Sequence, residues 1–213
     1  TNVASGTTQQ TQSIIDKGGI PLFARLLNSP NIEVAEQVPC FYFEGNLISV
    51  FDKLGCGAIG NISGENADLR DLVIYAGAVD PLIRLLKHPN IFKPAVWALS
   101  NLCRGRPAPK VALVKNAIPA LAQVVKEADD PAVLSDALWG LATLSGEQAL
   151  SWQMLLIRVV KVDSEEVDLE MIINTGVIPA LVAGISSSEV TIAIPALRVL
   201  GNILSGDEKY AEV

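Results

Sequence analysis

A motif that recurs along the chain constrains its fold more than any other feature. In each copy a small residue and two largely apolar positions precede a proline, and an amphipathic run follows. The four copies are GGIPLFARLL (18–27), GAVDPLIRLL (77–86), NAIPALAQVV (116–125) and GVIPALVAGI (176–185). Proline is tolerated in the first turn of a helix, because its missing N–H would have no partner there. Each copy therefore predicts the start of a helix.

Longer helical runs end in a second recurring element, which we call a tail. The five tails are TNVASG (1–6), GNISGE (60–65), SNLCRG (100–105), ATLSGE (142–147) and GNILSGD (201–207). Their glycines suit helix C-termini, and a short helix is expected at 67–76 before the next proline. A unit of two to three helices over about 40 residues is typical of armadillo and HEAT repeats. We predict an all-α chain, a right-handed armadillo α-solenoid superhelix forming one domain over 1–213.

Composition agrees with packed helices and limits the function. Half of the residues are hydrophobic but only 5% are aromatic, which favours helices over a β-sandwich. The net charge of −7 argues against a nucleic-acid partner and favours a cationic one. Cys40, Cys56 and Cys103 are too widely spaced for a disulfide framework or a metal site, so no metal or cofactor is expected. The sequence contains no uninterrupted apolar run of about 18 residues, so no membrane span is expected.

Two of the repeat units are longer than the others. The motif prolines stand at 21, 81, 119 and 179, in steps of 60, 38 and 60 residues. The excess maps to inserted segments at about 38–55 and 148–164. We expect the second segment to form a loop, and Pro39, Gly45 and Gly55 to break a helix in the first. One hypothesis is that both are non-coding sequence retained in the reading frame, which sequencing of the spliced transcript would test.

The tails place an amide at a recurring position. Trp97 and Asn101 stand four residues apart, so they share one face of a helix. Asn recurs at the same position in four of the five tails. An unsatisfied buried amide costs about 1–3 kcal/mol, so each Asn needs a partner. That partner is either an external ligand or an adjacent helix or loop, and the indoles either line a site or pack in the core.

The tail sequences resemble the importin-α (karyopherin-α) family. The segments that carry the likeness are TNVASGTTQQT, GNISGENADLRDLVIYAGAVDPL, WALSNLCRGRPAP and ALRVLGNILSGDE. The likeness covers nearly the whole chain outside the two inserted segments, from the second repeat's tail to the sixth's. It implies a nuclear import adaptor that shuttles between cytoplasm and nucleus and binds Lys/Arg-rich nuclear localisation signals in extended form. It also implies importin-β as a partner of the full-length protein, through a segment that this sequence does not contain.

The resemblance assigns peptide-binding roles to particular residues. Asn amides would bond the peptide backbone, and indoles would hold its cationic side chains. Acidic Glu65, where the family usually carries Asp, would select a central lysine. The residues that match are Asn2, Ser5, Gly6, Thr11, Asn61, Glu65, Trp97, Asn101, Arg104, Asp136, Trp139, Arg198 and Asn202.

The chain also departs from the family pattern. Gly57 stands where a Trp is expected, and Thr143 stands where the family usually carries Tyr. Trp97 and Asn101 therefore form the only complete Trp-x-x-x-Asn of the five tails. We expect the loss of one indole to weaken peptide binding.

Two other interpretations stay open. A catenin-like armadillo scaffold would bind acidic or apolar partners through basic residues, whereas the tails here supply Glu65, Asp136, Glu147 and Asp207. A degenerate product would fold poorly and bind nothing, and would lack a cooperative helical melt. No hydrolase or nucleotide-binding motif occurs, and the single histidine, His88, lies in a predicted turn. We do not expect an enzyme.

Overall fold

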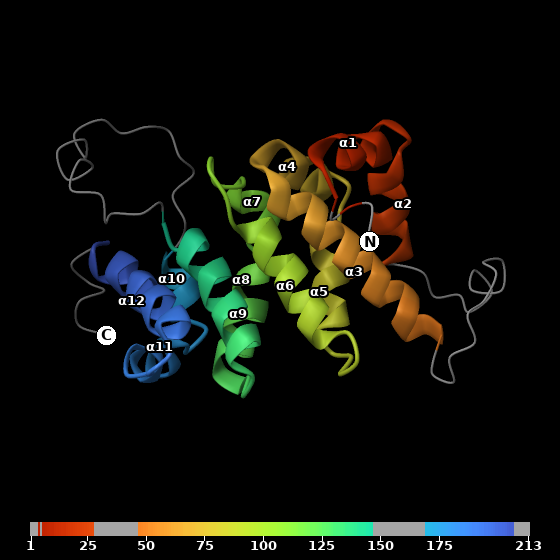
Figure 1. Ribbon diagram of the computed structural model, residues 1–213. Coiled ribbons are helices and arrows are strands. Elements are labelled where there is room, and N and C mark those ends of the chain that lie inside the picture. The colour runs from red at the N-terminus through yellow and green to blue at the C-terminus, as the bar shows by residue number, and fades with distance from the viewer. Residues whose placement is uncertain (1–3, 5, 28–46, 147–168, 207–213) are drawn as a thin grey trace. The chain divides into compact units, whose positions relative to one another are not determined.

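The computed structural model describes residues 4, 6–27, 47–146 and 169–206, and every regular element among them is a helix. The chain divides into two compact units, residues 1–102 and 103–213. Figure 1 shows the helices of each unit packed side by side as short antiparallel pairs. The first half of the first inserted segment (38–46) and all of the second (148–164) lie outside the described residues.

The first unit is built on two long helices. In chain order its helices are α1 (Thr8–Asp16), α2 (Gly19–Leu26), α3 (Leu47–Glu65), α4 (Ala67–Tyr75), α5 (Val79–Leu85) and α6 (Phe92–Cys103). The two long helices are α3 and α6. Helix α3 packs against α2 and α4. The core of the first unit includes Ile59 and Ile62 of α3 and Leu99 and Leu102 of α6, each less than 2% exposed.

The second unit repeats the same plan. Its helices are α7 (Val111–Val114), α8 (Ala117–Glu127), α9 (Pro131–Leu144), α10 (Leu169–Ile173), α11 (Ile178–Ile185) and α12 (Val190–Leu204). The α11–α12 pair packs on the α8–α9 pair, chiefly through α12 against α9. Leu121, Leu138, Leu141 and Ile172 are fully buried in the core of this unit.

All four proline motifs head helices, as the sequence predicts. They begin α2, α5, α8 and α11, and the predicted short helix at 67–76 is α4. Gly18, Gly77 and Gly176, which open three of the motifs, have φ of 73°, 79° and 68°. In this left-handed conformation they end α1, α4 and α10, a role for which a residue without Cβ is preferred.

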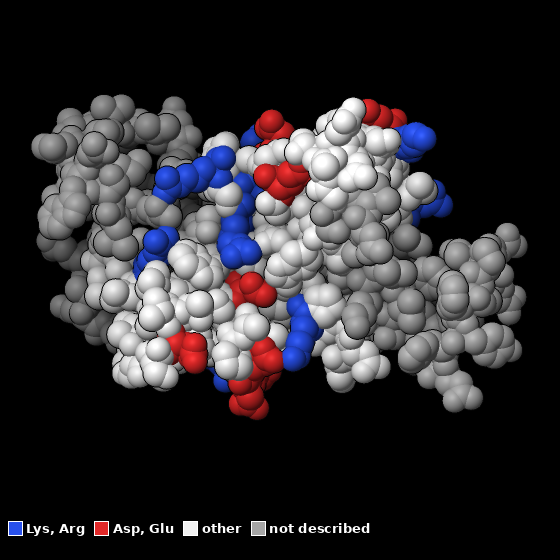
Figure 2. Space-filling view, viewed as in Figure 1, with Lys and Arg blue, Asp and Glu red and all other residues white. Residues whose placement is uncertain are grey.

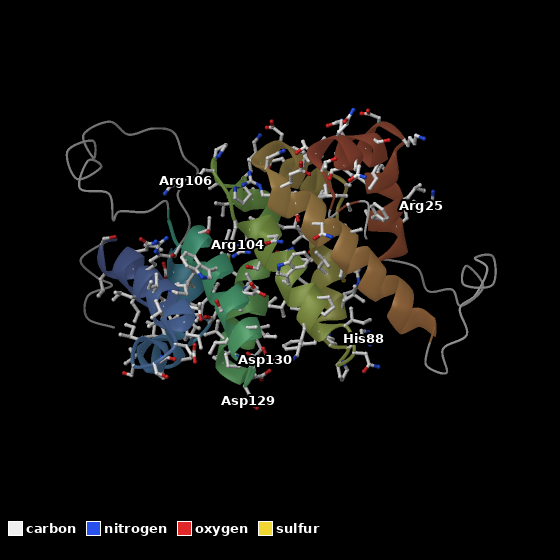
Figure 3. The ribbon with its side chains drawn as sticks, in the orientation of Figure 1. Arg25, His88, Arg104, Arg106, Asp129 and Asp130 are labelled. Atoms are coloured by element: carbon white, nitrogen blue, oxygen red, sulfur yellow. The ribbon has the colours of Figure 1, made fainter. Side chains whose placement is uncertain are left out.

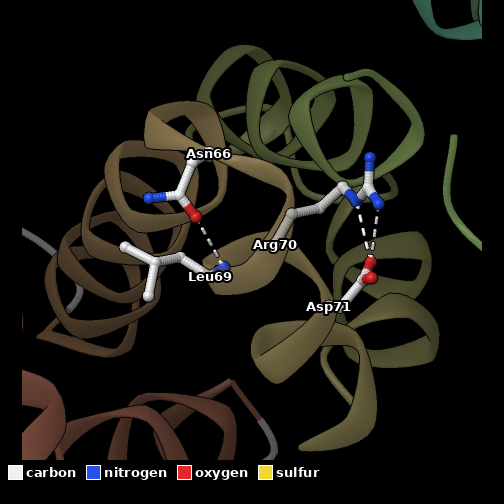
Figure 4. A network of polar contacts seen from close by, with 4 residues as sticks. All are labelled: Asn66, Leu69, Arg70 and Asp71. Atoms are coloured by element: carbon white, nitrogen blue, oxygen red, sulfur yellow. Dashed lines mark hydrogen bonds and ion pairs between the residues drawn. The ribbon is translucent and has the colours of Figure 1, made fainter. Parts of the chain in front are cut away.

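The sharp turn between α3 and α4 has a cap and a buried charge (Figure 4). The Asn66 side chain accepts a hydrogen bond from the Leu69 N–H at 2.9 Å, so it caps α4. Arg70 is fully buried and its Nε and Nη2 donate to Asp71 Oδ1 at 2.9 and 2.8 Å. A buried guanidinium is tolerable only with such a partner.

The expectation of a break at Gly55 is wrong. Helix α3 runs without interruption from Leu47 to Glu65 and includes both Gly55 and Gly57. Glycine in a helix interior costs only about 1 kcal/mol, which tertiary packing offsets. Cys56 and Ala58, on either side of Gly57, are completely buried and show how this stretch is held. Pro39 and Gly45 lie outside the described residues.

The described part of the chain contains neither a membrane-spanning helix nor a group of side chains suited to a metal ion. None of its helices is long and apolar enough to cross a membrane. Within the same residues, no group of three or more His, Cys, Asp or Glu side chains could hold a metal ion.

Candidate functional site

A surface depression of about 430 Å³ lies in the first unit, where α3 and α6 end beside the segment that leads into α1. We call it the Glu65 depression. Its lining residues are Ala4, Gly6, Thr8, Gly60, Asn61, Gly64, Glu65, Trp97 and Asn101. Five of these, Gly6, Asn61, Glu65, Trp97 and Asn101, are predicted site residues. The structure thus brings together positions that are up to 95 residues apart in the chain.

Two glycines of α3 shape the depression. A Cβ added to Gly60 would lie 2.2 Å from Cζ3 of Trp97, and one added to Gly64 would lie 3.1 Å from Nδ2 of Asn101. The four-residue spacing of Trp97 and Asn101 on α6 is therefore matched by the four-residue spacing of the glycines on α3. Gly60 and Gly64 are not among the predicted site residues, although their four-residue spacing is present in the tail segment GNISG.

The carboxylate of Glu65 gives the depression its charge. Its Oε1 is buried and has no hydrogen-bond partner among the described residues. Glu65 is also the last residue of α3, where the helix dipole adds partial negative charge. Burying a carboxylate oxygen without a partner is costly, so a cationic group placed here would gain a strong interaction.

Two of the recurring asparagines bond to a preceding helix. Asn101 is 6% exposed and its Nδ2 donates to the Gly60 carbonyl at 2.9 Å. The Nδ2 of Asn202 donates to the carbonyls of Ala142 and Gly146, both at 3.3 Å, and to Ser145 Oγ at 2.8 Å. Gly60 and Ala142 occupy the same position in their tails. These two asparagines thus have partners within the protein.

The bonds of Asn101 and Asn202 do not exhaust what an amide can do. A carboxamide offers two N–H donors and an oxygen acceptor. The hydrogen bonds described for both residues are donated by Nδ2, and they fix the orientation of each amide.

A second group of predicted residues lies within the second unit. The Arg198 guanidinium carbon lies 4.8 Å from the centre of the Trp139 ring, a cation–π contact. The Nε of Arg198 is buried and has no hydrogen-bond partner among the described residues. Burial raises the pKa of the Asp136 carboxyl, and the positive charge of Arg104 offsets part of that rise. Figure 3 labels Arg104 among the side chains of this unit.

Thr11 does not line the Glu65 depression. Thr11 is 1% exposed, and its hydroxyl donates to the Thr7 carbonyl at 3.5 Å. Asn2 and Ser5 lie outside the described residues. Thr143 donates to the carbonyl of Trp139 in its own helix at 3.2 Å. His88 is exposed in the turn between α5 and α6 (Figure 3), as the sequence predicts.

Replacing Asp136 with Asn tests the cost of burying this carboxylate. The pKa in the folded chain lies above the ordinary 3.8, so the folded state holds the proton more tightly than the unfolded state. The group's contribution to stability is therefore greatest below pH 3.8 and is lost as pH rises through the folded-state value. We expect Asp136→Asn to melt at a higher temperature than the unmodified chain at pH 7. The difference in melting temperature should shrink as pH falls toward about 4. A lower melting temperature for Asp136→Asn than for the unmodified chain at pH 7 would contradict this prediction.

Comparisons with known proteins identify the family. A model of the armadillo/beta-catenin-like repeat matches residues 7–38 and 66–104. All of the chain aligns with importin subunit alpha-1b of Oryza sativa subsp. japonica at 33% identity over 215 residues, and with importin subunit alpha-1a of the same plant at 35%. The chain belongs to the importin-α family. It is also 33% identical to importin subunit alpha-3 of Arabidopsis thaliana, and it spans 34% of the length of each of these relatives.

Solved structures confirm the fold. A designed armadillo repeat protein in complex with the peptide (KR)4 has a TM-score of 0.69 at 22% identity, over 99% of this chain and 75% of that one. Computationally designed armadillo repeat proteins for modular peptide recognition reach 0.73 at 20% identity, with the same coverage. At these identities the likeness establishes the fold alone, which is the predicted all-α armadillo solenoid class.

Proposed function

We propose that this chain is part of a nuclear import adaptor and binds Lys/Arg-rich nuclear localisation signal peptides in an extended conformation. The observation that carries the proposal is one depression lined by both Trp97 and Glu65, whose buried Oε1 has no hydrogen-bond partner among the described residues. A lysine side chain matches both, because its ammonium group pairs with a carboxylate and its methylene stem packs on an indole.

Electrostatics favour the same kind of ligand. The depression lies at the C-terminal end of α3, and the whole chain carries a net charge of −7. Such a field attracts cationic segments and raises their association rate at low ionic strength. It is unfavourable for the acidic partners of a catenin-like scaffold.

Backbone recognition would come from the asparagines. An extended peptide has unpaired N–H and C=O groups, and each bond that an amide makes to them contributes about 0.5–1.5 kcal/mol. Asn61 and Asn101 both line the depression, so they are the residues we assign to this role. Arg104, Asp136, Trp139, Arg198 and Asn202 are proposed to contact the peptide from the second unit.

The relatives support the wider role. They are named importin subunits alpha, and a designed armadillo repeat protein of the same fold has been solved with the peptide (KR)4. By extension, we propose that the intact protein shuttles between cytoplasm and nucleus with importin-β as partner and that it acts by binding rather than catalysis.

Calorimetric titration tests the proposal. The ligand is a monopartite lysine-rich peptide, compared with a variant in which the central Lys is replaced by Ala. We expect the substitution to weaken binding about tenfold or more, the loss of one charge-assisted contact. An acidic peptide of equal length is the negative control. Equal affinities for the two lysine-rich peptides would overturn the proposal, as would tighter binding of the acidic one.

A further inference from the structure

The Glu65 depression has one buried acceptor that lacks a donor. Among the described residues, Oε1 of Glu65 is the one buried side-chain oxygen without a hydrogen-bond partner. Glu65 is also the only charged residue that lines the depression. A ligand group with one positive charge and one N–H satisfies this oxygen. Each further N–H that the ligand buried here would need an acceptor of its own.

The indole of Trp97 gives the same depression an aromatic wall. Gly60 fits closely against this indole, since a Cβ added to Gly60 would lie 2.2 Å from Cζ3 of Trp97. Aromatic rings attract ammonium groups and also bind methylated ones, including methyl-lysine. The depression measures about 430 Å³. A methyl group takes up about as much space as a water molecule, roughly 30 Å³. Methyl groups on a ligand's nitrogen therefore fit within the depression.

The electrostatic surroundings of Glu65 favour any ligand that keeps a positive charge. Figure 2 shows acidic side chains over α4, which begins two residues after Glu65, and the whole chain carries a net charge of −7. Lysine keeps its charge when its nitrogen is methylated and loses it when the nitrogen is acetylated. Electrostatic attraction therefore acts alike on lysine and methylated lysine, and does not act on acetyl-lysine.

We propose that the Glu65 depression also binds peptides whose central lysine carries one or two methyl groups on its nitrogen. Dimethyl-lysine brings one positive charge and one N–H for Oε1 of Glu65, and its methyl groups are available to the indole of Trp97. Trimethyl-lysine has the charge but no N–H, and acetyl-lysine has an N–H but no charge. The inference rests on the proposed function and names a further class of ligand for the same site.

Calorimetric titration with four lysine-rich peptides tests the inference. The peptides differ only at the central position, which is lysine, dimethyl-lysine, trimethyl-lysine or acetyl-lysine. Dimethyl-lysine should bind at least as tightly as lysine and up to about tenfold tighter, since a fully buried methyl group contributes up to about fourfold in affinity. Trimethyl-lysine should bind at least about threefold more weakly than dimethyl-lysine, because the lost hydrogen bond outweighs one added methyl group. Acetyl-lysine should bind at least about tenfold more weakly than lysine.

Two variants of the protein show whether Glu65 reads the N–H. In Glu65→Gln the affinities for dimethyl-lysine and trimethyl-lysine should come within about twofold, because a neutral amide oxygen accepts a weaker hydrogen bond than a carboxylate. The matched control is Asp68→Asn, which removes the same charge at an exposed residue of α4 and should leave the difference between the two peptides unchanged. Circular dichroism should show the same helical content in both variants.

The outcomes separate this inference from the proposed function. If the lysine peptide binds and the dimethyl-lysine peptide binds more weakly, the inference fails and the proposed function stands. Trimethyl-lysine bound as tightly as dimethyl-lysine would also overturn the inference, as would an undiminished difference between these two peptides in Glu65→Gln. If none of the four peptides binds, the proposed function fails together with the inference.

Discussion

Replacing Glu65 with Gln should weaken binding of a lysine-rich peptide roughly 10- to 150-fold. A hydrogen bond to a charged partner contributes about 1.5–3 kcal/mol, and each 1.4 kcal/mol is a factor of ten in affinity. Gln keeps the size and the carbonyl oxygen of Glu65 but removes the negative charge. The loss should be near the upper end, because Oε1 is buried and has no partner among the described residues that could compensate.

The matched control for Glu65→Gln is Asp68→Asn. Asp68 is exposed in the first turn of α4, three residues from Glu65, and its replacement changes the net charge of −7 by the same one unit. We expect Asp68→Asn to change peptide affinity less than about threefold, since an exposed charge is screened by salt. Equal losses of affinity in the two variants would mean that Glu65 acts only through its contribution to the net negative charge of the chain.

Gly60→Ala should destabilise the protein, against the usual effect of this substitution in a helix. Ala in place of a helical Gly normally stabilises by about 0.5–1 kcal/mol. At position 60 the new methyl would lie 2.2 Å from Cζ3 of Trp97, so the rigid indole or the helix must move. Overpacking of this kind costs about 1–3 kcal/mol. We therefore expect urea unfolding to show a net loss of stability, and peptide affinity to fall as Trp97 shifts.

Gly201→Ala is the control for Gly60→Ala. Gly201 also lies inside a long helix, α12, but a Cβ added there meets nothing within 4 Å. The same chemical change should therefore raise stability by about 0.5–1 kcal/mol at this site. Equal effects of the two substitutions would show that the contact between Gly60 and Trp97 does not control the position of the indole.

Much of the helical architecture could be predicted because its signals are local. A proline in the first turn and a left-handed glycine after the last turn act within a few residues. This is why the starts of α2, α5, α8 and α11 and the existence of α4 follow from the sequence. The four-residue spacing of Trp97 and Asn101 is local in the same sense, and it correctly places both on one side of the Glu65 depression.

The features that sequence patterns missed depend on contacts between distant segments. Gly55 and Gly57 are poor helix formers, yet tertiary packing keeps α3 continuous through them. The bond from Asn101 to the Gly60 carbonyl joins residues 41 positions apart, and no spacing within one tail reveals it. Gly60 and Gly64 acquire their role only when α6 lies against α3. Thr11 shares the family pattern, but the fold buries it.

A double-mutant cycle between protein and peptide tests the central claim most directly. The protein is compared with Glu65→Gln, and the lysine-rich peptide with one whose central Lys is replaced by norleucine, which keeps the stem but removes the charge. If Glu65 pairs with that lysine, the two changes should be non-additive by about 1 kcal/mol or more. Additivity within about 0.3–0.5 kcal/mol would mean that Glu65 and the lysine do not interact, and would contradict the account.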